Sequence, residues 1–161
     1  MPERRSLQGL YQQHSYPSYS QCGEDRIAFY YFGERPIFYV DIGASVPCGH
    51  NNTYLFYEAG GRGILVEAEH EYHQAYSALR PRDNALEVAV VPEKMNVGQV
   101  RFYQTADQGW STVDINHLEI ARENGKSAID DTSVVVPTMC INDILELATK
   151  ETGGGGLTFC Q

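Results

Sequence analysis

Basic residues are scarce in this sequence, which holds 12 lysines and arginines against 21 aspartates and glutamates and has a net charge of −9 at pH 7. A phosphate backbone would be repelled over most of such a surface, so we expect no nucleic-acid partner. No apolar run approaches the roughly 20 residues that span a bilayer, and residues 1–13 lack the apolar stretch of a signal peptide. We therefore expect a cytoplasmic protein with no membrane span.

Closely spaced metal-binding or redox cysteines are also missing, because none of the four cysteines forms a Cys-x-x-Cys pair. We predict that all four are small buried hydrophobic residues: Cys22, Cys48, Cys140 and Cys160. The pair His70-x-x-His73 has no evident third ligand, so we expect no metal site. The length of 161 residues allows one domain with a proper core.

The first half of the chain alternates apolar runs with helical patterns after an irregular arm over residues 1–20. We predict, in order, a helix from Gln21, a buried strand over Ile37–Gly43, a helix over Thr53–Ala59 capped by Asn52, a strand over Gly63–Glu67, a helix over His70–Leu79 and a strand over Ala85–Val91. This alternation predicts an α/β fold whose sheet is mostly parallel, with the first three strands in the order 3-2-1.

The second half has weaker patterns. We predict a strand over Gln99–Tyr103, a helix over Ile115–Asn124, an edge strand over Val134–Pro137, a helix capped by Asn142 and a strand over Leu157–Cys160. We expect this last strand to lie beside the first one. In an open α/β sheet, ligands sit beyond the carboxyl ends of the strands, and here the chain stops at that point. The domain, residues 21–161, is therefore expected to be truncated after the start of its fourth strand.

The residues with the clearest chemical meaning lie at the ends of the first two strands. Asp41-Ile42-Gly43-Ala44 ends the first strand, and a glycine there lets a ligand approach the backbone. Glu67 ends the second strand, where a carboxylate can accept hydrogen bonds from both hydroxyls of a ribose. The loop Gly43–Cys48 lacks the Gly-x-Gly-x-x-Gly pattern that admits a pyrophosphate. The alternative interpretation is that both acids merely cap strand ends.

Eight segments follow one another along nearly the whole chain from Ser20: Ser20–Asp25, Phe38–Ala44, Asn51–Tyr57, Gly60–Glu67, Arg80–Asp83, Ala85–Ala89, Phe102–Tyr103 and Ser111–Thr112. As an ordered set they resemble the FkbM family of methyltransferases. The resemblance implies a Rossmann-like, three-layer methyltransferase fold that binds S-adenosyl-L-methionine. It also implies methyl transfer to a hydroxyl oxygen of a small-molecule or glycan acceptor, such as a sugar or a polyketide.

The same resemblance implies roles for individual positions. Asp41, Gly43 and Ala44 would face the methionine part of the cofactor, Glu67 would hold the ribose hydroxyls, Ala68 and Ala89 would lie beside the adenine, and Gln21 and Asn52 are candidates for the rim of the pocket. In the family, the fourth strand continues into an acidic segment beside the transferable methyl group, and this chain ends before that segment. The catalytic residues therefore stay unassigned.

Several alternatives stay open. Glu24 and Asp25 are the motif-linked acids outside the cofactor strands, yet acids in a first helical turn also suit the helix dipole. The chain is either a methyltransferase or a non-catalytic truncated remnant that acts through binding or through dimerisation over an exposed sheet edge. A third possibility is a nicotinamide-dependent oxidoreductase, which shares the acid at Glu67 but not the loop at Ser45–Cys48.

Overall fold

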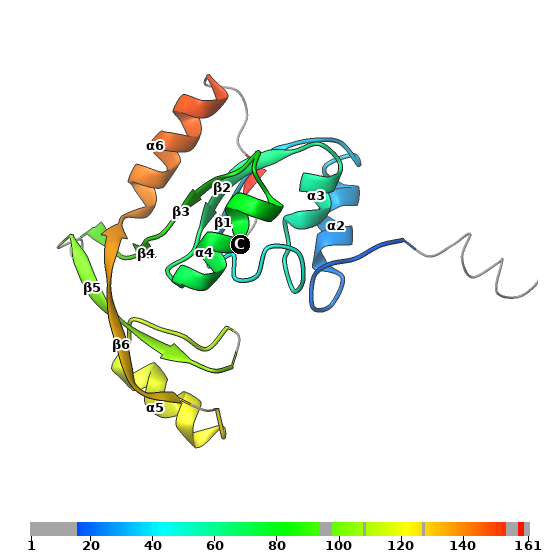
Figure 1. Ribbon diagram of the computed structural model, residues 1–161. Coiled ribbons are helices and arrows are strands. Elements are labelled where there is room, and N and C mark those ends of the chain that lie inside the picture. The colour runs from blue at the N-terminus through cyan, green and yellow to red at the C-terminus, as the bar shows by residue number, and fades with distance from the viewer. Residues whose placement is uncertain (1–15, 94–97, 108, 127, 154–157, 160–161) are drawn as a thin grey trace, which may run out of the picture.

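The computed structural model describes residues 16–93, 98–107, 109–126, 128–153 and 158–159 (Figure 1). Within these residues the elements are, in chain order, α2 (Glu24–Tyr31), β1 (Phe38–Ile42), α3 (Tyr54–Glu58), β2 (Arg62–Val66), α4 (His70–Leu79), β3 (Asn84–Leu86), β4 (Ala89–Val90), β5 (Gln99–Thr105), α5 (Ile115–Glu123), β6 (Ala128–Met139), α6 (Ile141–Thr152) and β7 (Thr158–Phe159). The fold is mixed α/β, with two small sheets and mostly parallel strands.

The first sheet has the strand order β3-β2-β1-β7, and each neighbouring pair is parallel. This confirms the predicted order of the first three strands and the place of the last strand beside the first. Strands β1 and β2 are rich in aromatic and β-branched residues, which suit a buried pleated surface. Ile42 is paired with Val66, so the carboxyl ends of β1 and β2 lie next to each other.

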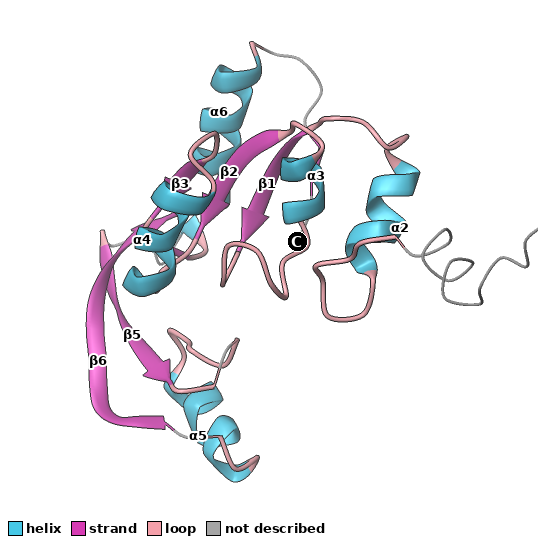
Figure 2. Cartoon of the chain, turned by 45° about the vertical axis from the view of Figure 1, so that its right-hand side comes forward, coloured by secondary structure: helices cyan, strands magenta, loops and turns pink. Residues whose placement is uncertain are grey.

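Alternate residues of the central strands pack against different helices, so helices cover both faces of the first sheet (Figure 2). On one face a core cluster joins the sheet to α2, α3 and α4: Phe29, Tyr39, Leu55, Phe56, Leu65 and Tyr76. On the other face a second cluster joins it to α6: Val40, Ile64, Val66, Ile144 and Ala148. The resulting helix–sheet–helix layering is compatible with a Rossmann-like fold.

The second sheet has the order β4-β6-β5, in which β4 is parallel and β5 antiparallel to β6. With α5 it extends away from the first sheet (Figure 2). The predicted single strand over Ala85–Val91 is wrong, because β3 belongs to the first sheet and β4 to the second. The chain changes sheet at residues 87–88, and an apolar run without alternation gives no sign of such a break.

The expectation of an edge strand around Pro137 is also wrong, since β6 is the middle strand of the second sheet. A proline is tolerated because β4 pairs with β6 only at Thr138 and Met139. The N–H of Thr138 donates to the carbonyl of Gly98 on the β5 side. The position of the missing proline N–H faces the opposite side, where β4 has not yet begun, because Ala89, its first residue, is paired with Thr138.

Several predicted ends and environments differ from the structure. The N-cap residues of α3 and α6 are Thr53 and Cys140 rather than Asn52 and Asn142. Helix α2 begins at Glu24 rather than Gln21, because Gly23 before it adopts a left-handed conformation with φ 87°.

The cysteines do not share one environment. Cys140 is buried as predicted, whereas Cys22 and Cys48 are exposed, so the prediction of burial is wrong for these two. Cys160 lies outside the described residues.

In the part of the chain that the structure describes, no helix has both the length and the apolar character needed to cross a bilayer.

Candidate functional site

The candidate site begins where the chain turns after β1. The N–H groups of Gly43 and Ala44 donate to the carbonyl of Val66 at 2.8 and 3.2 Å, which fastens this turn to the end of β2. Gly43 has a φ of 71°, in the left-handed region that favours glycine. Ser45 follows with a φ of 55°, which is uncommon for a residue with a side chain. The turn therefore places two backbone N–H groups and the Ser45 N–H at the carboxyl end of the sheet.

Glu67, directly after β2, is held by backbone donors on both of its carboxylate oxygens. The N–H of Ser45 donates to Oε2 and the N–H of Glu69 donates to Oε1, each at 2.8 Å. Only 8% of the residue is exposed, and this burial raises the pKa of the carboxyl group even though the backbone donors favour its charged form. An ionised carboxylate has about four acceptor sites, so each oxygen can accept a further hydrogen bond.

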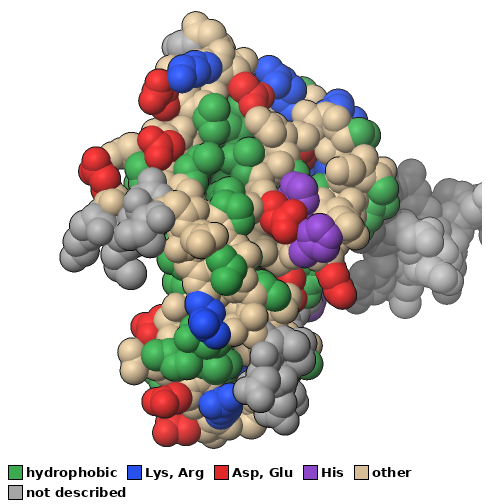
Figure 3. All heavy atoms as spheres, turned by 60° about the vertical axis from the view of Figure 1, so that its left-hand side comes forward, with side chains coloured by type: hydrophobic (Ala, Val, Ile, Leu, Met, Phe, Trp, Pro, Cys, Tyr) green, Lys and Arg blue, Asp and Glu red, His purple; other side chains and the backbone are tan. Residues whose placement is uncertain are grey.

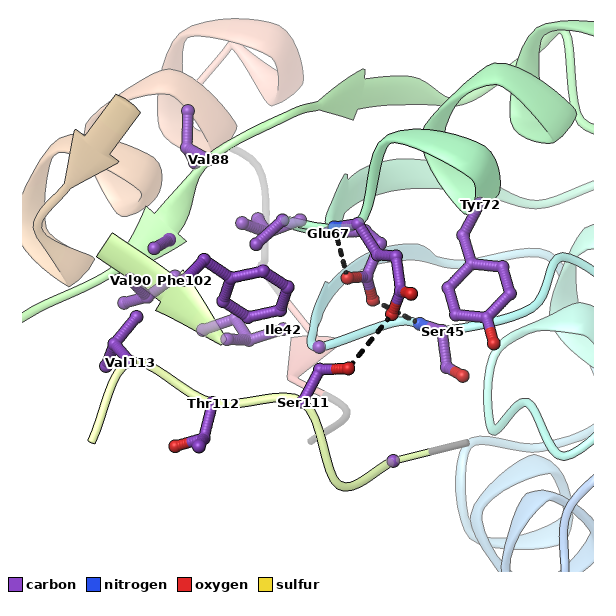
Figure 4. A pocket seen from close by; sticks show the side chains of 16 residues that line it. Ile42, Ser45, Glu67, Tyr72, Val88, Val90, Phe102, Ser111, Thr112 and Val113 are labelled. Atoms are coloured by element: carbon purple, nitrogen blue, oxygen red, sulfur yellow. Dashed lines mark hydrogen bonds between the residues drawn. The ribbon is translucent and has the colours of Figure 1, made fainter. Parts of the chain in front are cut away.

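A cavity of about 330 Å³ opens above Glu67 (Figure 4). Its apolar wall comes from the ends of β1 and β2, from β4 and from β5: Ile42, Val66, Ala68, Val88, Ala89, Val90 and Phe102. Its polar groups come from Glu67, Glu69, Tyr72 and Ser111. A mostly apolar cavity of this size with a few convergent polar groups is typical of a small-molecule site.

The loop between β5 and α5 forms the far wall of this cavity. Thr112 pairs with Tyr103 as an isolated antiparallel bridge, and the Ser111 hydroxyl accepts from the N–H of Thr105 at 3.1 Å. The same hydroxyl donates to Oε2 of Glu69 at 3.4 Å, across the cavity (Figure 4). The second sheet thus contributes to the site through this loop and through Phe102; the sequence marked Phe102 and Ser111 as parts of motifs but did not place them in the cofactor pocket.

A second cavity of about 190 Å³ has a polar lining: Gln21, Glu24, Gly43, Ser45, His50, Asn52 and Gly109. It shares Gly43, Ser45 and Gly109 with the first cavity. Gln21 and Asn52, expected at the rim of the cofactor pocket, line this second cavity, whereas Gly43, Glu67, Ala68 and Ala89 line the first. Ala44, at 3% exposure, packs in the core, and Asp41 is buried; neither lines these two cavities.

Asp41 instead lies beneath the turn. Its Oδ2 accepts from the Thr53 hydroxyl at 2.7 Å, and 4% of the residue is exposed. Burial raises the pKa of this carboxyl group, partly offset by the hydrogen bond from Thr53 and the charge of Arg80. The Asn51 amide donates to the carbonyls of Ala44 and Val46 at 2.8 and 3.3 Å. These buried groups hold the loop between β1 and α3 from below.

Arg80 is the centre of this network, and the sequence marked it only as part of a motif. Its guanidinium donates to five oxygens on three segments of the chain: Tyr39 Oη at 3.0 Å, the Pro47 carbonyl at 3.2 Å, Asn51 Oδ1 at 3.0 Å, Thr53 Oγ1 at 3.0 Å and Asp83 Oδ2 at 2.7 Å. The residue is only 1% exposed, so these bonds replace water around a buried charge. The spacing of Arg80 and Asp83 was the available signal, since Asp83 lies three positions after Arg80 in the sequence.

The acids at the start of α2 have structural partners. Asp25 is fully buried, and its carboxylate accepts from the hydroxyls of Ser18 and Ser20 at 2.7 and 2.8 Å and from the Tyr19 N–H at 2.6 Å. Burial would raise the pKa of Asp25, but these hydrogen bonds outweigh it and lower the pKa. Glu24 accepts from the N–H of Cys22 at 2.8 Å and has a lowered pKa because of backbone hydrogen bonds. A base needs a pKa near the working pH, so neither acid is suited to that role.

His70 and His73 share one acidic partner, Glu87. Their Nδ1 atoms lie 2.9 and 3.2 Å from the two carboxylate oxygens of Glu87. Figure 3 shows histidine side chains beside an acidic side chain on this face of the molecule. No group of three or more histidine, cysteine or acidic residues suited to a metal ion occurs in the part of the chain that is described.

Comparison of the chain with family models, with curated proteins and with solved structures finds no match. The resemblance to the FkbM methyltransferases therefore stays a prediction from the sequence motifs. The geometry of the two cavities and of Glu67 is the evidence on which a functional proposal can draw.

Proposed function

We propose that this chain binds S-adenosyl-L-methionine at the carboxyl ends of β1 and β2 and transfers its methyl group to a hydroxyl oxygen. The observation that carries the proposal is the placement of Glu67 at the base of the larger cavity, with one backbone N–H on each carboxylate oxygen. In sheets with this strand order, an acid at the end of the second strand holds the two hydroxyls of a ribose.

The lining of the cavity fits a nucleoside. Both oxygens of Glu67 retain acceptor capacity, so two neighbouring ribose hydroxyls can donate to the same carboxylate. Ala68, Ala89 and Phe102 form an apolar wall around the cavity and pack together in one cluster. A flat aromatic base gains from burial against such a surface. These residues would hold the adenosyl part of the cofactor.

The surroundings of the turn after β1 argue against a nicotinamide dinucleotide. A pyrophosphate needs a glycine-rich turn that leads directly into a helix N-terminus, whereas the first helix after β1 begins only at Tyr54. None of the described residues that line the two cavities is a lysine or an arginine. Glu67 and Glu69 would instead repel phosphate groups placed in the cavity.

The role of the protein in methyl transfer is chiefly to position the reacting atoms. The bound cofactor supplies a sulfonium-activated methyl group, and the rate gain comes from aligning the acceptor oxygen, the methyl carbon and the sulfur. Glu67 and the turn at Gly43–Ser45 fix the orientation of the nucleoside. As the sequence resemblance implies, the acceptor would be a sugar, glycan or polyketide hydroxyl.

Isothermal titration calorimetry with S-adenosylhomocysteine and, separately, with NAD⁺ tests the proposal. We expect S-adenosylhomocysteine to bind and NAD⁺ not to bind. The Glu67→Gln variant should bind S-adenosylhomocysteine at least about tenfold more weakly. Its amide N–H₂ group would face a backbone N–H that now donates to the carboxylate, and it could no longer accept a hydrogen bond from one of the ribose hydroxyls.

The matched control is Glu119→Gln, the same change at an exposed position on α5. Circular dichroism verifies that each variant is folded. Unchanged affinity in Glu67→Gln, tight binding of NAD⁺, or no binding by the folded chain would overturn the proposal. Release of S-adenosylhomocysteine when the chain is incubated with S-adenosyl-L-methionine and hydroxylated acceptors then tests turnover.

A further inference from the structure

Two carboxylates, not one, face the larger cavity. Glu67 at the end of β2 and Glu69 at the N-cap of α4 both line it, and they are close enough for the charge of Glu67 to act on the Glu69 carboxyl group. The Glu69 N–H donates to Glu67, so the backbone fixes the two residues relative to each other. The Glu69 side chain has a different partner, the hydroxyl of Ser111 on the opposite loop at 3.4 Å. Glu69 thus extends into the cavity from the nucleoside wall toward the loop.

Within the part of the chain that the structure describes, this pair has no lysine or arginine beside it in either cavity. Glu24 adds a third carboxylate in the smaller cavity. Arg80 is committed to Asp83 and its other oxygen partners, and His70 and His73 face Glu87. Burial, and for Glu69 also the charge of Glu67, raises the pKa of both carboxyl groups. For both groups burial is the largest cause of the raised pKa.

We propose that the cavity selects a positively charged ligand over its neutral counterpart, and that Glu69 is the residue that sets this preference. This inference rests on the proposed function. S-adenosyl-L-methionine carries a sulfonium cation, whereas S-adenosylhomocysteine carries a neutral thioether. Methyl transfer forms a bond between the acceptor oxygen and the methyl carbon, releases the hydroxyl proton of the acceptor to water and leaves the electron pair of the broken C–S bond on sulfur, so the positive charge at sulfur disappears with the reaction. The product is then held less tightly than the substrate, which favours its release.

The charge state of the ligand, rather than its shape, is the basis of the preference. Glu67 would bind the ribose of S-adenosyl-L-methionine and of S-adenosylhomocysteine equally, so it contributes the same binding free energy to both ligands. The Glu69 side chain bonds Ser111, whereas the Ser45 N–H bonds Glu67, and the effect of Glu69 on a cation is electrostatic. Such an effect weakens with salt because mobile ions screen charges at a partly open site.

Calorimetric titrations with three ligands test the inference: S-adenosyl-L-methionine, S-adenosylhomocysteine and sinefungin, in which a protonated amine replaces the sulfonium. We expect both cationic ligands to bind about tenfold more tightly than S-adenosylhomocysteine at low ionic strength, with a smaller ratio at high salt. In Glu69→Gln the ratio should fall to about threefold or less while the affinity for S-adenosylhomocysteine is kept.

The matched control is Glu71→Gln, which removes the same charge from an exposed position two residues further along α4. This variant should keep the wild-type ratio. Equal affinities for the three ligands in the wild type, or an unchanged ratio in Glu69→Gln, would overturn the inference while leaving the proposed function intact. If none of the three ligands binds the folded wild type, the proposed function itself fails.

Discussion

Arg80 donates from Nε to Oδ2 of Asp83 at 2.7 Å, and neither side chain is exposed to solvent. The same guanidinium reaches Asn51 and Thr53 in the loop between β1 and α3. Because Asn51 in turn holds the carbonyl of Ala44, the end of α4 supports the turn that carries the Ser45 N–H. The position of the carboxylate that we assign to the ribose therefore depends on a buried charge on the far side of that loop.

The first prediction concerns this buried charge. Replacing Arg80 with methionine removes the cation and leaves the Asp83 carboxylate buried without its positive partner. The loop oxygens of Asn51 and Thr53 also lose the donor that they accept from. We expect a loss of about 3–5 kcal/mol in the free energy of unfolding, measured by urea denaturation. Arg80→Lys should also be strongly destabilising, because one ammonium group cannot reach five acceptors that are arranged for a planar fork.

The comparison for this prediction is Arg62→Met. Arg62 forms an ion pair with Glu151 at 3.1 Å, but half of its side chain, 51%, is exposed. Exposed pairs contribute about 0–1 kcal/mol, so we expect a loss of this size. Similar losses in the Arg80 and Arg62 variants would contradict the role of Arg80 as a buried anchor.

The second prediction concerns the close packing of β1 and β2 beneath the site. A Cβ atom at Gly63 would lie 2.2 Å from the Tyr39 ring and from its backbone oxygen. Tyr39 is fully buried and its hydroxyl is bonded to Asp83 and Arg80, so the ring cannot move aside without breaking those bonds. We expect Gly63→Ala to cost several kcal/mol, about 3 or more, or to prevent folding, as followed by urea denaturation and circular dichroism.

Gly49 provides the matched comparison for the same substitution. A Cβ atom there would have no heavy atom within 4 Å, and the backbone does not adopt the left-handed conformation. We expect Gly49→Ala to change the free energy of unfolding by about 0.5 kcal/mol or less. A well-folded Gly63→Ala variant of wild-type stability would show that the strands can separate locally to make room.

The elements that the sequence predicted well are those with strong local signals. Helix α4 spans His70–Leu79 as predicted, because a helical pattern ends there just before Pro81. Strands β1 and β2 were predictable because their apolar runs are too continuous for a half-exposed strand. The end of the second run also placed Glu67 at a strand end. The neighbouring positions of Gly43 and Glu67 then follow from the topology of parallel strands.

The features that the sequence did not predict depend on partners that are distant in the chain. The apolar residues of 85–91 give no sign that β3 and β4 join different sheets. Phe102 and Ser111 reach the cavity only because β5 pairs with β6 and folds its following loop back over Glu69. Arg80 resembles a surface charge at the end of a helix until its oxygen partners, several of them more than 25 positions away, are known.

The last prediction concerns the dependence of stability on pH. Burial and the charge of Glu67 raise the pKa of Glu69 above the ordinary value of 4.5. The folded state therefore binds more protons than the unfolded state over a window that begins near pH 4.5 and extends upward to the folded pKa. Within that window the contribution of this group to stability falls as the pH rises. Asp25 has the opposite sign, since its lowered pKa makes its contribution disappear only as the pH falls below about 3.8.

Urea denaturation of the ligand-free protein between pH 5 and pH 7 measures the effect. We expect Glu69→Gln to flatten the fall in the free energy of unfolding with pH, because the variant has no proton to lose at this position. Glu119→Gln on the exposed face of α5 should leave the slope as it is in the wild type. If the Glu69 variant keeps the full wild-type slope, the carboxyl group is not held in the desolvated, negatively charged surroundings from which we infer cation selectivity.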